Sequence, residues 1–150
     1  MFSHVLLVLH LLSVVAWVGG MFFAHFCLRP AAMETLQPPE RLSLWCATLG
    51  RFFRYVAVAV VLGLLTGGLL FLRVGFQAAP VGWHVMLALG IVMAGVFVYI
   101  YLGLYPKLVR NCRNSAWADA AQVQNRIRQL VSVNLALGVV VILAAVFARG

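Results

Sequence analysis

Four long stretches of mostly apolar residues alternate with shorter polar segments along the chain. A helix rises about 1.5 Å per residue, so about 20 apolar residues are enough to cross a hydrocarbon core about 30 Å thick. The pattern therefore predicts four membrane-spanning helices, at residues 5–26, 52–72, 83–104 and 130–147. Too few residues remain between them for a separate domain. The expected fold is all-α, a single four-helix transmembrane bundle over residues 1–150.

The polar segments before the second and fourth spans predict helical extensions of those spans. A Pro-Pro-Glu turn at 38–40 precedes a helix-compatible segment, 41–54, that runs into the second span. Asn114 and Ser115 offer an N-cap for a helix over 116–130 that continues into the fourth span.

Composition points to lipid as the main solvent of the chain. Of its residues, 65% are hydrophobic and 9% are charged, and the mean hydropathy is +1.05. A soluble domain carries about a quarter charged residues, so too little polar surface remains here to cover a soluble globule. Soluble enzymes are excluded, as are disordered, collagen-like and disulfide-framework proteins.

The formal net charge of +8 is concentrated on one side of the predicted bundle. The first and third connections and their flanks hold nine of the 11 Lys and Arg residues, leaving only Arg73 and Arg149 on the other side. Because positive charge favours the cytoplasmic face, both termini are predicted to face the periplasm of a bacterial inner membrane. No Lys or Arg precedes the first span, which is predicted to be a retained helix and not a signal peptide. The charge thus indicates orientation in a lipid bilayer, and no nucleic-acid partner is expected.

Histidines inside the spans are the best pointers to function, because ionisable or metal-binding side chains are costly within a bilayer. His10 lies about a turn and a half inside the first span. At 100° per residue, Trp17 and Met21 lie within about 20° of its direction, and His25 is offset by about 60°. We expect this face of the first helix to point into the bundle.

His84 enters the third span from the same side of the membrane as His10, with a depth difference of roughly 5 Å. The two imidazoles are candidate ligands for one copper ion or for the two faces of one haem b. His4, at the entrance to the first span, and Met86 are candidate additional copper ligands. Arg73 is a candidate partner for a haem propionate.

His25 and Met21 are candidate ligands of a second metal site, with softer ligands, toward the predicted cytoplasmic end of the bundle. The sulfur-bearing residues expected at that end are Cys27, Met33, Cys46 and Cys112. Thioethers and thiolates suit Cu(I), but these residues have no diagnostic metal spacing. On the predicted cytoplasmic side the cysteines are expected to be free thiols.

Several of these residues also have ordinary structural interpretations. His4 can be hydrated at the interface, His25 can hydrogen-bond a carbonyl or headgroup, and methionine fills gaps in apolar packing. Gly63 and Gly67 predict a helix-packing face, and Asn134 predicts a hydrogen bond between helices.

Acidic residues occur only in the connections, as Glu34, Glu40 and Asp119. The membrane interior therefore lacks a carboxylate pair for hydrolysis or a carboxylate proton relay. A hydrolase or transferase is therefore not expected. If the protein is an enzyme, the expected class is a haem-dependent membrane oxidoreductase.

Short motifs in three spans resemble the copper resistance protein D (CopD) family. The matching segments are LHLL at 9–12, AWVGG at 16–20, LRP at 28–30, RFFR at 51–54, LTG at 65–67 and GWH at 82–84. The resemblance implies a membrane protein of copper uptake or tolerance, in a family whose members are often larger multi-span proteins.

A more distant likeness is to the HemJ type of protoporphyrinogen oxidase, a small four-helix membrane protein that binds haem b. His10 corresponds to the first-helix histidine of that family, and Trp83 and His84 match part of its third-helix Trp, His and Lys cluster. Met86 stands at the position of the lysine, a departure that argues against protoporphyrinogen oxidation and leaves haem binding open.

Three hypotheses follow. The first is CopD-like copper handling through intramembrane His and Met ligands, with a periplasmic copper carrier as a candidate partner. The second is a haem b redox protein with His10 and His84 as axial ligands and a respiratory partner. The third is a structural or accessory membrane subunit. Each is compatible with an oligomer.

Overall fold

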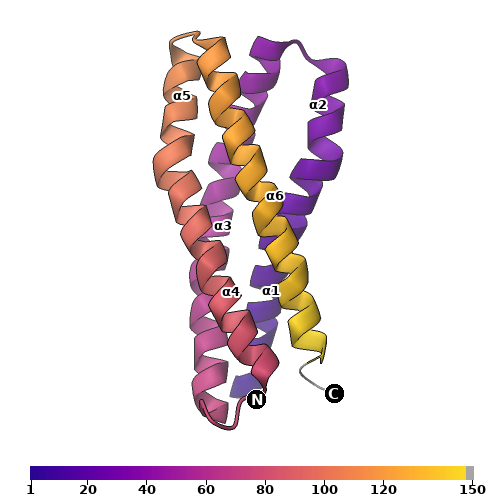
Figure 1. Ribbon diagram of the computed structural model, residues 1–150, viewed down its shortest axis with the longest axis vertical. Helices are drawn as coiled ribbons and strands as arrows, with labels where there is room; N and C mark the ends of the chain where they lie inside the picture. Colours follow the sequence, from indigo (N-terminus) through magenta and orange to yellow (C-terminus); the bar gives the residue numbers. More distant parts are fainter. Residues whose placement is uncertain (148–150) are drawn as a thin grey trace.

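The computed structural model describes residues 1–147, and within that range its regular secondary structure is entirely helical. Arg149 lies outside the described residues. Its α-helices are α1 (Phe2–Phe23), α2 (Arg29–Thr35), α3 (Pro38–Val74), α4 (Val81–Val98), α5 (Tyr105–Arg113) and α6 (Trp117–Phe147). They run lengthwise in one elongated bundle (Figure 1).

Four continuous helices long and apolar enough to cross a membrane result from these elements, which confirms the predicted all-α architecture. They are Phe2–Thr35, Pro38–Val74, Val81–Arg113 and Trp117–Phe147. Each is longer than the apolar stretch that predicts it. The second has 37 residues, a length of about 55 Å, so its ends extend beyond a hydrocarbon core about 30 Å thick.

The predicted helical extensions are confirmed, but the predicted N-cap at Asn114 and Ser115 is wrong, because Asn114 ends α5, Ser115 lies in the turn with a φ of 53°, and Ala116 directly precedes α6. The second long helix begins at Pro38, where the Gln37 side chain accepts from the backbone and the Glu40 carboxylate accepts from the Gln37 N–H in a capping box. The fourth begins at Trp117 and continues without a break through Phe147.

Two of the long helices contain a π-helical stretch that the sequence pattern did not predict. Residues Ala24–Leu28 join α1 to α2, and residues Tyr99–Leu104 join α4 to α5. Each stretch directly precedes a helix with proline near its first turn, Pro30 or Pro106. Proline lacks an amide donor and clashes with the carbonyl four residues earlier, so a locally widened helix accommodates it without a break.

The two ends of the bundle differ in their connections. The start of α1, the end of α6 and the turn between α3 and α4 lie together at one end (Figure 1). The turns between α2 and α3 and between α5 and α6 lie at the other end. We call these the termini end and the connection end.

Small residues of α3 pack against α1, as the sequence predicted. Gly63 of α3 lies against Ser13 of α1, and Gly67 lies against His10. Asn134 of α6 donates from Nδ2 to the carbonyl oxygen of Met93 in α4 at 3.1 Å, which confirms its predicted interhelical role.

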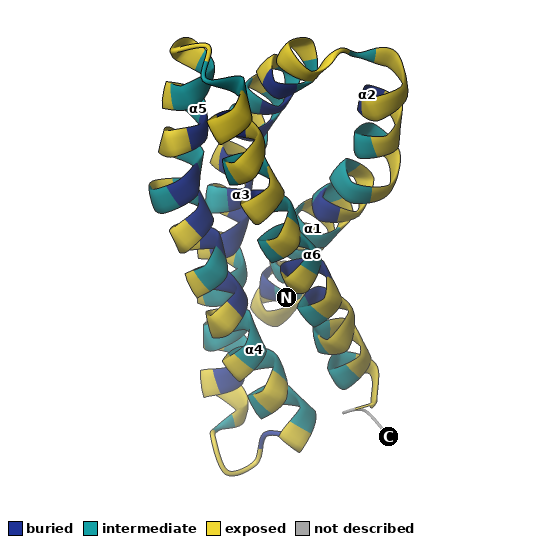
Figure 2. Ribbon diagram, turned by 45° about the horizontal axis from the view of Figure 1, so that its top comes forward, coloured by how far each residue is buried: buried dark blue, intermediate teal, exposed yellow. Residues whose placement is uncertain are grey.

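Aromatic packing fills the connection half of the bundle. Phe53 contacts Phe97, Tyr101 and Tyr105 edge-on, with ring centroids 5.8, 5.9 and 5.5 Å apart. Exposed residues, many of them Leu, Val and Phe, cover the outer faces (Figure 2), as expected of helices that face lipid. This aromatic core contrasts with the termini half, which holds the larger cavity.

Candidate functional site

A cavity of about 700 Å³ lies between α1, α3, α4 and α6 in the termini half. Its surface is mostly apolar, and its volume is within the range of small-molecule and cofactor sites, about 300–1,000 Å³. The polar or sulfur-bearing side chains that line it are Ser3, His4, His10, Ser13, Trp83, Met86 and Met93, with Trp17 alongside them.

His10 is the imidazole held most firmly at this cavity. Its Nδ1 lies 2.9 Å from the carbonyl oxygen of Gly63 and 3.4 Å from the Thr66 hydroxyl, which itself donates to the Leu62 carbonyl. A carbonyl can only accept, so Nδ1 carries the proton and donates to Gly63. The neutral ring therefore keeps its lone pair on Nε2, the arrangement in which a backbone carbonyl orients a metal-ligating histidine.

Gly67 makes room for this ring. A Cβ atom at position 67 would lie 2.8 Å from Cε1 and 3.1 Å from Nδ1 of His10. The Gly63 and Gly67 pair thus does more than pack two helices, because it supplies both the acceptor for the imidazole and the space beside it.

Sulfur ligands approach the same cavity from α4. Met86 and Met93 both line it, and Met86 is half-buried whereas Met93 is buried. His4 lines the cavity as well and is exposed. Met21 is buried in the bundle as expected, where it packs with Met93 and Leu135, but it does not itself line the cavity.

His84 is not among the cavity-lining residues, although its neighbour Trp83 is. Its ring lies edge-on to Phe71 and Phe76, with centroids 5.0 and 4.7 Å away, and its Nδ1 is 3.2 Å from the Pro80 carbonyl oxygen. The structure therefore does not bring His84 and His10 to one cavity surface. Positions two apart on a helix differ by about 200° in direction, so His84 and Met86 face opposite ways.

Arg73 lies next to a residue of the cavity lining and is not itself part of the lining. Its guanidinium donates to the Ser3 hydroxyl at 2.7 Å and lies 4.5 Å from the centre of the Phe2 ring. Since Ser3 lines the cavity, the charge of Arg73 sits one residue away from it.

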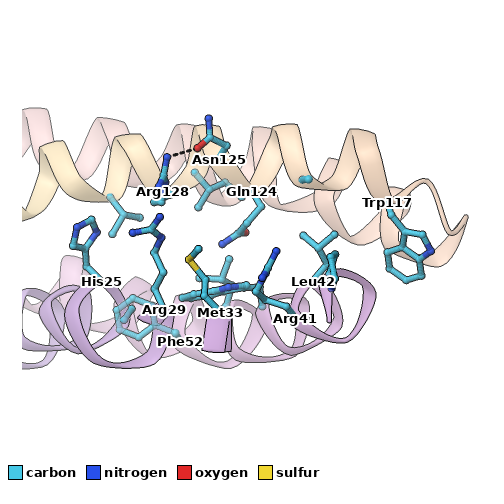
Figure 3. Close-up of a pocket in the computed structure, with 17 residues that line it drawn as sticks. His25, Arg29, Met33, Arg41, Leu42, Phe52, Trp117, Gln124, Asn125 and Arg128 are labelled. Atoms are coloured by element: carbon cyan, nitrogen blue, oxygen red, sulfur yellow. Dashed lines mark hydrogen bonds between the residues drawn. The ribbon is translucent and has the colours of Figure 1, made fainter. Parts of the chain in front are cut away.

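A second, smaller pocket of about 260 Å³ lies in the connection half, between α2, α3 and α6. Arg29, Arg41 and Arg128 line it from three helices; Figure 3 shows His25 at one end and the Arg128 guanidinium hydrogen-bonded to Asn125 of its own helix. Its lining contains no acidic residue. This pocket suits the negatively charged group of a ligand, with apolar side chains beneath it.

His25 has a side-chain partner that the sequence did not reveal. Its Nδ1 lies 3.2 Å from the hydroxyl of Ser132, and that hydroxyl donates to the Arg128 carbonyl at 2.9 Å. Of the sulfur-bearing residues expected near His25, Met33 lines its pocket, whereas Cys27, Cys46 and Cys112 do not.

Within residues 1–147, no group of three or more His, Cys, Asp or Glu side chains could hold a metal ion. A metal site at the large cavity would have to combine imidazole with thioether. Such a set suits Cu(I) better than it suits Zn(II), which prefers four nitrogen, oxygen or thiolate ligands.

Fold and cavity together define a four-helix membrane protein that presents an oriented imidazole and thioethers to an apolar internal space. The family model for copper resistance protein D matches residues 46–148. The chain belongs to this family, as its motifs predict. The matched segment includes His84, Met86 and Met93, and His10 lies before it. No curated protein and no solved structure matches the chain.

Proposed function

We propose that this protein handles copper within the membrane, with His10 as the principal ligand at the large cavity. The observation that carries the proposal is the hydrogen bond from His10 Nδ1 to the Gly63 carbonyl, which leaves Nε2 free to bind. Met86 and Met93 supply thioethers on the facing helix, and membership in a family named for copper resistance supports the choice of metal.

The route of copper follows from the proposed orientation. With the termini end toward the periplasm of a bacterial inner membrane, the exposed His4 would lie nearer the periplasmic surface than His10, and both line the cavity. A periplasmic carrier would then deliver copper to the cavity from the termini end, where imidazole and thioether ligands would replace the ligands of the carrier.

Copper accumulation in cells tests this function. Cells that express the wild type should accumulate more copper than cells with the His10→Ala variant, at equal amounts of membrane protein, as measured by elemental mass spectrometry. His84→Ala is the matched control, because His84 lies outside the cavity and should leave accumulation unchanged. Equal copper in the His10→Ala and wild-type cells would refute the proposal.

The volume of the cavity favours haem b as a second candidate. A single ion needs far less than about 700 Å³, whereas a flat, largely apolar cofactor fits both the volume and the lining. His10 and the Met86 thioether would hold the haem iron, and Arg73, beside the lining residue Ser3, would pair with a propionate. The bound haem would supply one-electron chemistry. Purified protein from haem-replete cells should then show a Soret band that His10→Ala abolishes, and a spectrum without that band would eliminate this candidate.

A further inference from the structure

Two cysteines 66 residues apart in the sequence meet in the connection half of the bundle. The Sγ atoms of Cys46 in α3 and Cys112 in α5 lie 2.8 Å apart. Each thiol also lies 4.0 Å from a carbonyl oxygen of the facing helix, that of Leu108 for Cys46 and that of Leu42 for Cys112. The contact is therefore reciprocal, since each carbonyl belongs to the residue four positions before the other cysteine.

The surroundings hold this pair in place without offering it a third ligand. Both cysteines are half-buried against the aromatic and aliphatic core, and Leu108 beside them is fully buried. The Tyr105 hydroxyl donates to the Cys46 carbonyl at 3.1 Å, which ties α5 to α3 at this level. Among the described residues no third His, Cys, Asp or Glu joins the two thiols.

The number of ligands selects the metal. Structural Zn(II) and iron–sulfur clusters require four protein ligands, which this pair does not provide. Cu(I) is a soft ion that accepts thiolates at low coordination number. We propose that Cys46 and Cys112 form a two-thiolate Cu(I) site at the connection end of the bundle; the identity of the metal rests on the copper-handling function proposed above.

Binding is a ligand exchange without redox change. One Cu(I) replaces two thiol protons, so two S–H bonds break, two Cu–S bonds form, and two protons pass to solvent. The product carries one negative charge, and Arg110 and Arg113 in the last turn of α5 place positive charge at the same end of the bundle. Metal–thiolate bonds are about 2.3 Å long, so the sulfur atoms must separate by about 2 Å, which rotation about the Cα–Cβ bonds would supply.

This site is separate from the cavity that holds His10. Cys46 and Gly63, the partner of His10, lie 17 positions apart on α3, a distance of about 26 Å along the helix. The protein would then have two copper sites, one at His10 near the termini end and one at the two thiols near the connection end. Cys27 is exposed and solitary, and it provides a matched control.

Competition for Cu(I) tests the proposal on the full chain, purified in detergent and kept reduced and free of oxygen. Bathocuproine disulfonate is the chromogenic competitor. In a His10→Ala background, wild-type cysteines and the Cys27→Ser variant should take one Cu(I) from the competitor. Cys46→Ser or Cys112→Ser should each lower the affinity at least tenfold. Equal affinity in all cysteine variants would refute the two-thiolate site. Unchanged copper accumulation in cells with His10→Ala would instead refute the copper-handling function proposed for the cavity.

Alkylation provides a second test that needs no substitution. Bound Cu(I) should protect Cys46 and Cys112 from maleimide and leave Cys27 reactive, as read by peptide mass spectrometry. Protection of none of the three would contradict the site. Recovery of Cys46 and Cys112 as a disulfide under these reducing conditions would contradict it as well.

Discussion

At the scale of single residues, one hydrogen bond organises the candidate site. His10 could be identified from the sequence because an imidazole deep in an apolar span needs a partner. That partner, the Gly63 carbonyl, could not be identified, because a helical wheel describes one helix and not the neighbour that faces it. The same limit explains His84, whose depth suited a shared ligand site but whose direction is toward Phe71 and Phe76.

Substitution of Gly67 by alanine should displace the His10 ring. A Cβ at this position meets Cε1 at 2.8 Å, so the ring must rotate away from Gly63 while the helices remain packed. We expect Cu(I) affinity at the cavity to fall at least tenfold, measured by competition in a Cys46→Ser, Cys112→Ser background. Gly95→Ala is the control, since its Cβ would meet nothing within 4 Å and Gly95 does not line the cavity. Equal Cu(I) affinities in the two variants would show that the position of the His10 ring does not affect copper binding.

At the scale of elements, the apolar stretches predicted the number and order of the helices but not their full length or their π-helical stretches. Hydropathy ends where charged residues begin, whereas the helices continue because their polar first and last turns still form backbone hydrogen bonds. The π-helical stretches depend on how the chain relaxes around Pro30 and Pro106, which the pattern of apolar residues does not encode.

Removal of Pro106 should change the register of α5. An alanine restores the amide donor to the carbonyl of Leu102, and loss of one extra residue from the π-helical stretch would turn α5 by about 100°. Cys112 would then move away from Cys46. Disulfide formation between them under a mild oxidant should fall in Pro106→Ala, measured by mass spectrometry in a Cys27→Ser background. Pro30→Ala, on another helix, should cross-link like its parent, and unchanged cross-linking in Pro106→Ala would refute the role of the proline.

The arginine-lined pocket between α2, α3 and α6 predicts stabilisation by anionic lipid. Phosphatidylglycerol added to the detergent should raise the melting temperature of the wild type. Its phosphate can bind the arginine side chains of the pocket, because no acidic residue in the lining competes for them. The increase should be smaller in an Arg29→Gln, Arg128→Gln variant. Arg113→Gln, outside the pocket and exposed, should respond as the wild type does. An equal response in all three proteins would place the lipid effect elsewhere.

At the scale of the whole molecule, the connection half has an aromatic core and a pocket of about 260 Å³, whereas the termini half has a larger cavity of about 700 Å³. This division was not predictable from the apolar pattern, since the four apolar spans run through both halves and the difference arises from which side chains meet. The aromatic cluster around Phe53 fills the core of the connection half, while glycines at the helix contacts leave space in the termini half. The distribution of Lys and Arg, in contrast, predicts orientation directly from the sequence.

Orientation can be measured with two introduced cysteines in a cysteine-free variant. Gln77 lies in the exposed turn at the termini end, and Asn114 lies in the exposed turn at the connection end. A membrane-impermeant maleimide should label Gln77→Cys and not Asn114→Cys in intact spheroplasts, and the reverse should hold in inverted vesicles. The opposite pattern would invert the proposed topology.

The most direct test of the account is the Cu(I) affinity of the cavity itself. In a Cys46→Ser, Cys112→Ser background, competition with bathocuproine disulfonate reports only on the remaining ligands. The account predicts that His10→Ala lowers this affinity at least tenfold and that His84→Ala leaves it unchanged. Undiminished affinity in His10→Ala, or a larger loss in His84→Ala, would contradict the claim that His10 holds copper in this cavity.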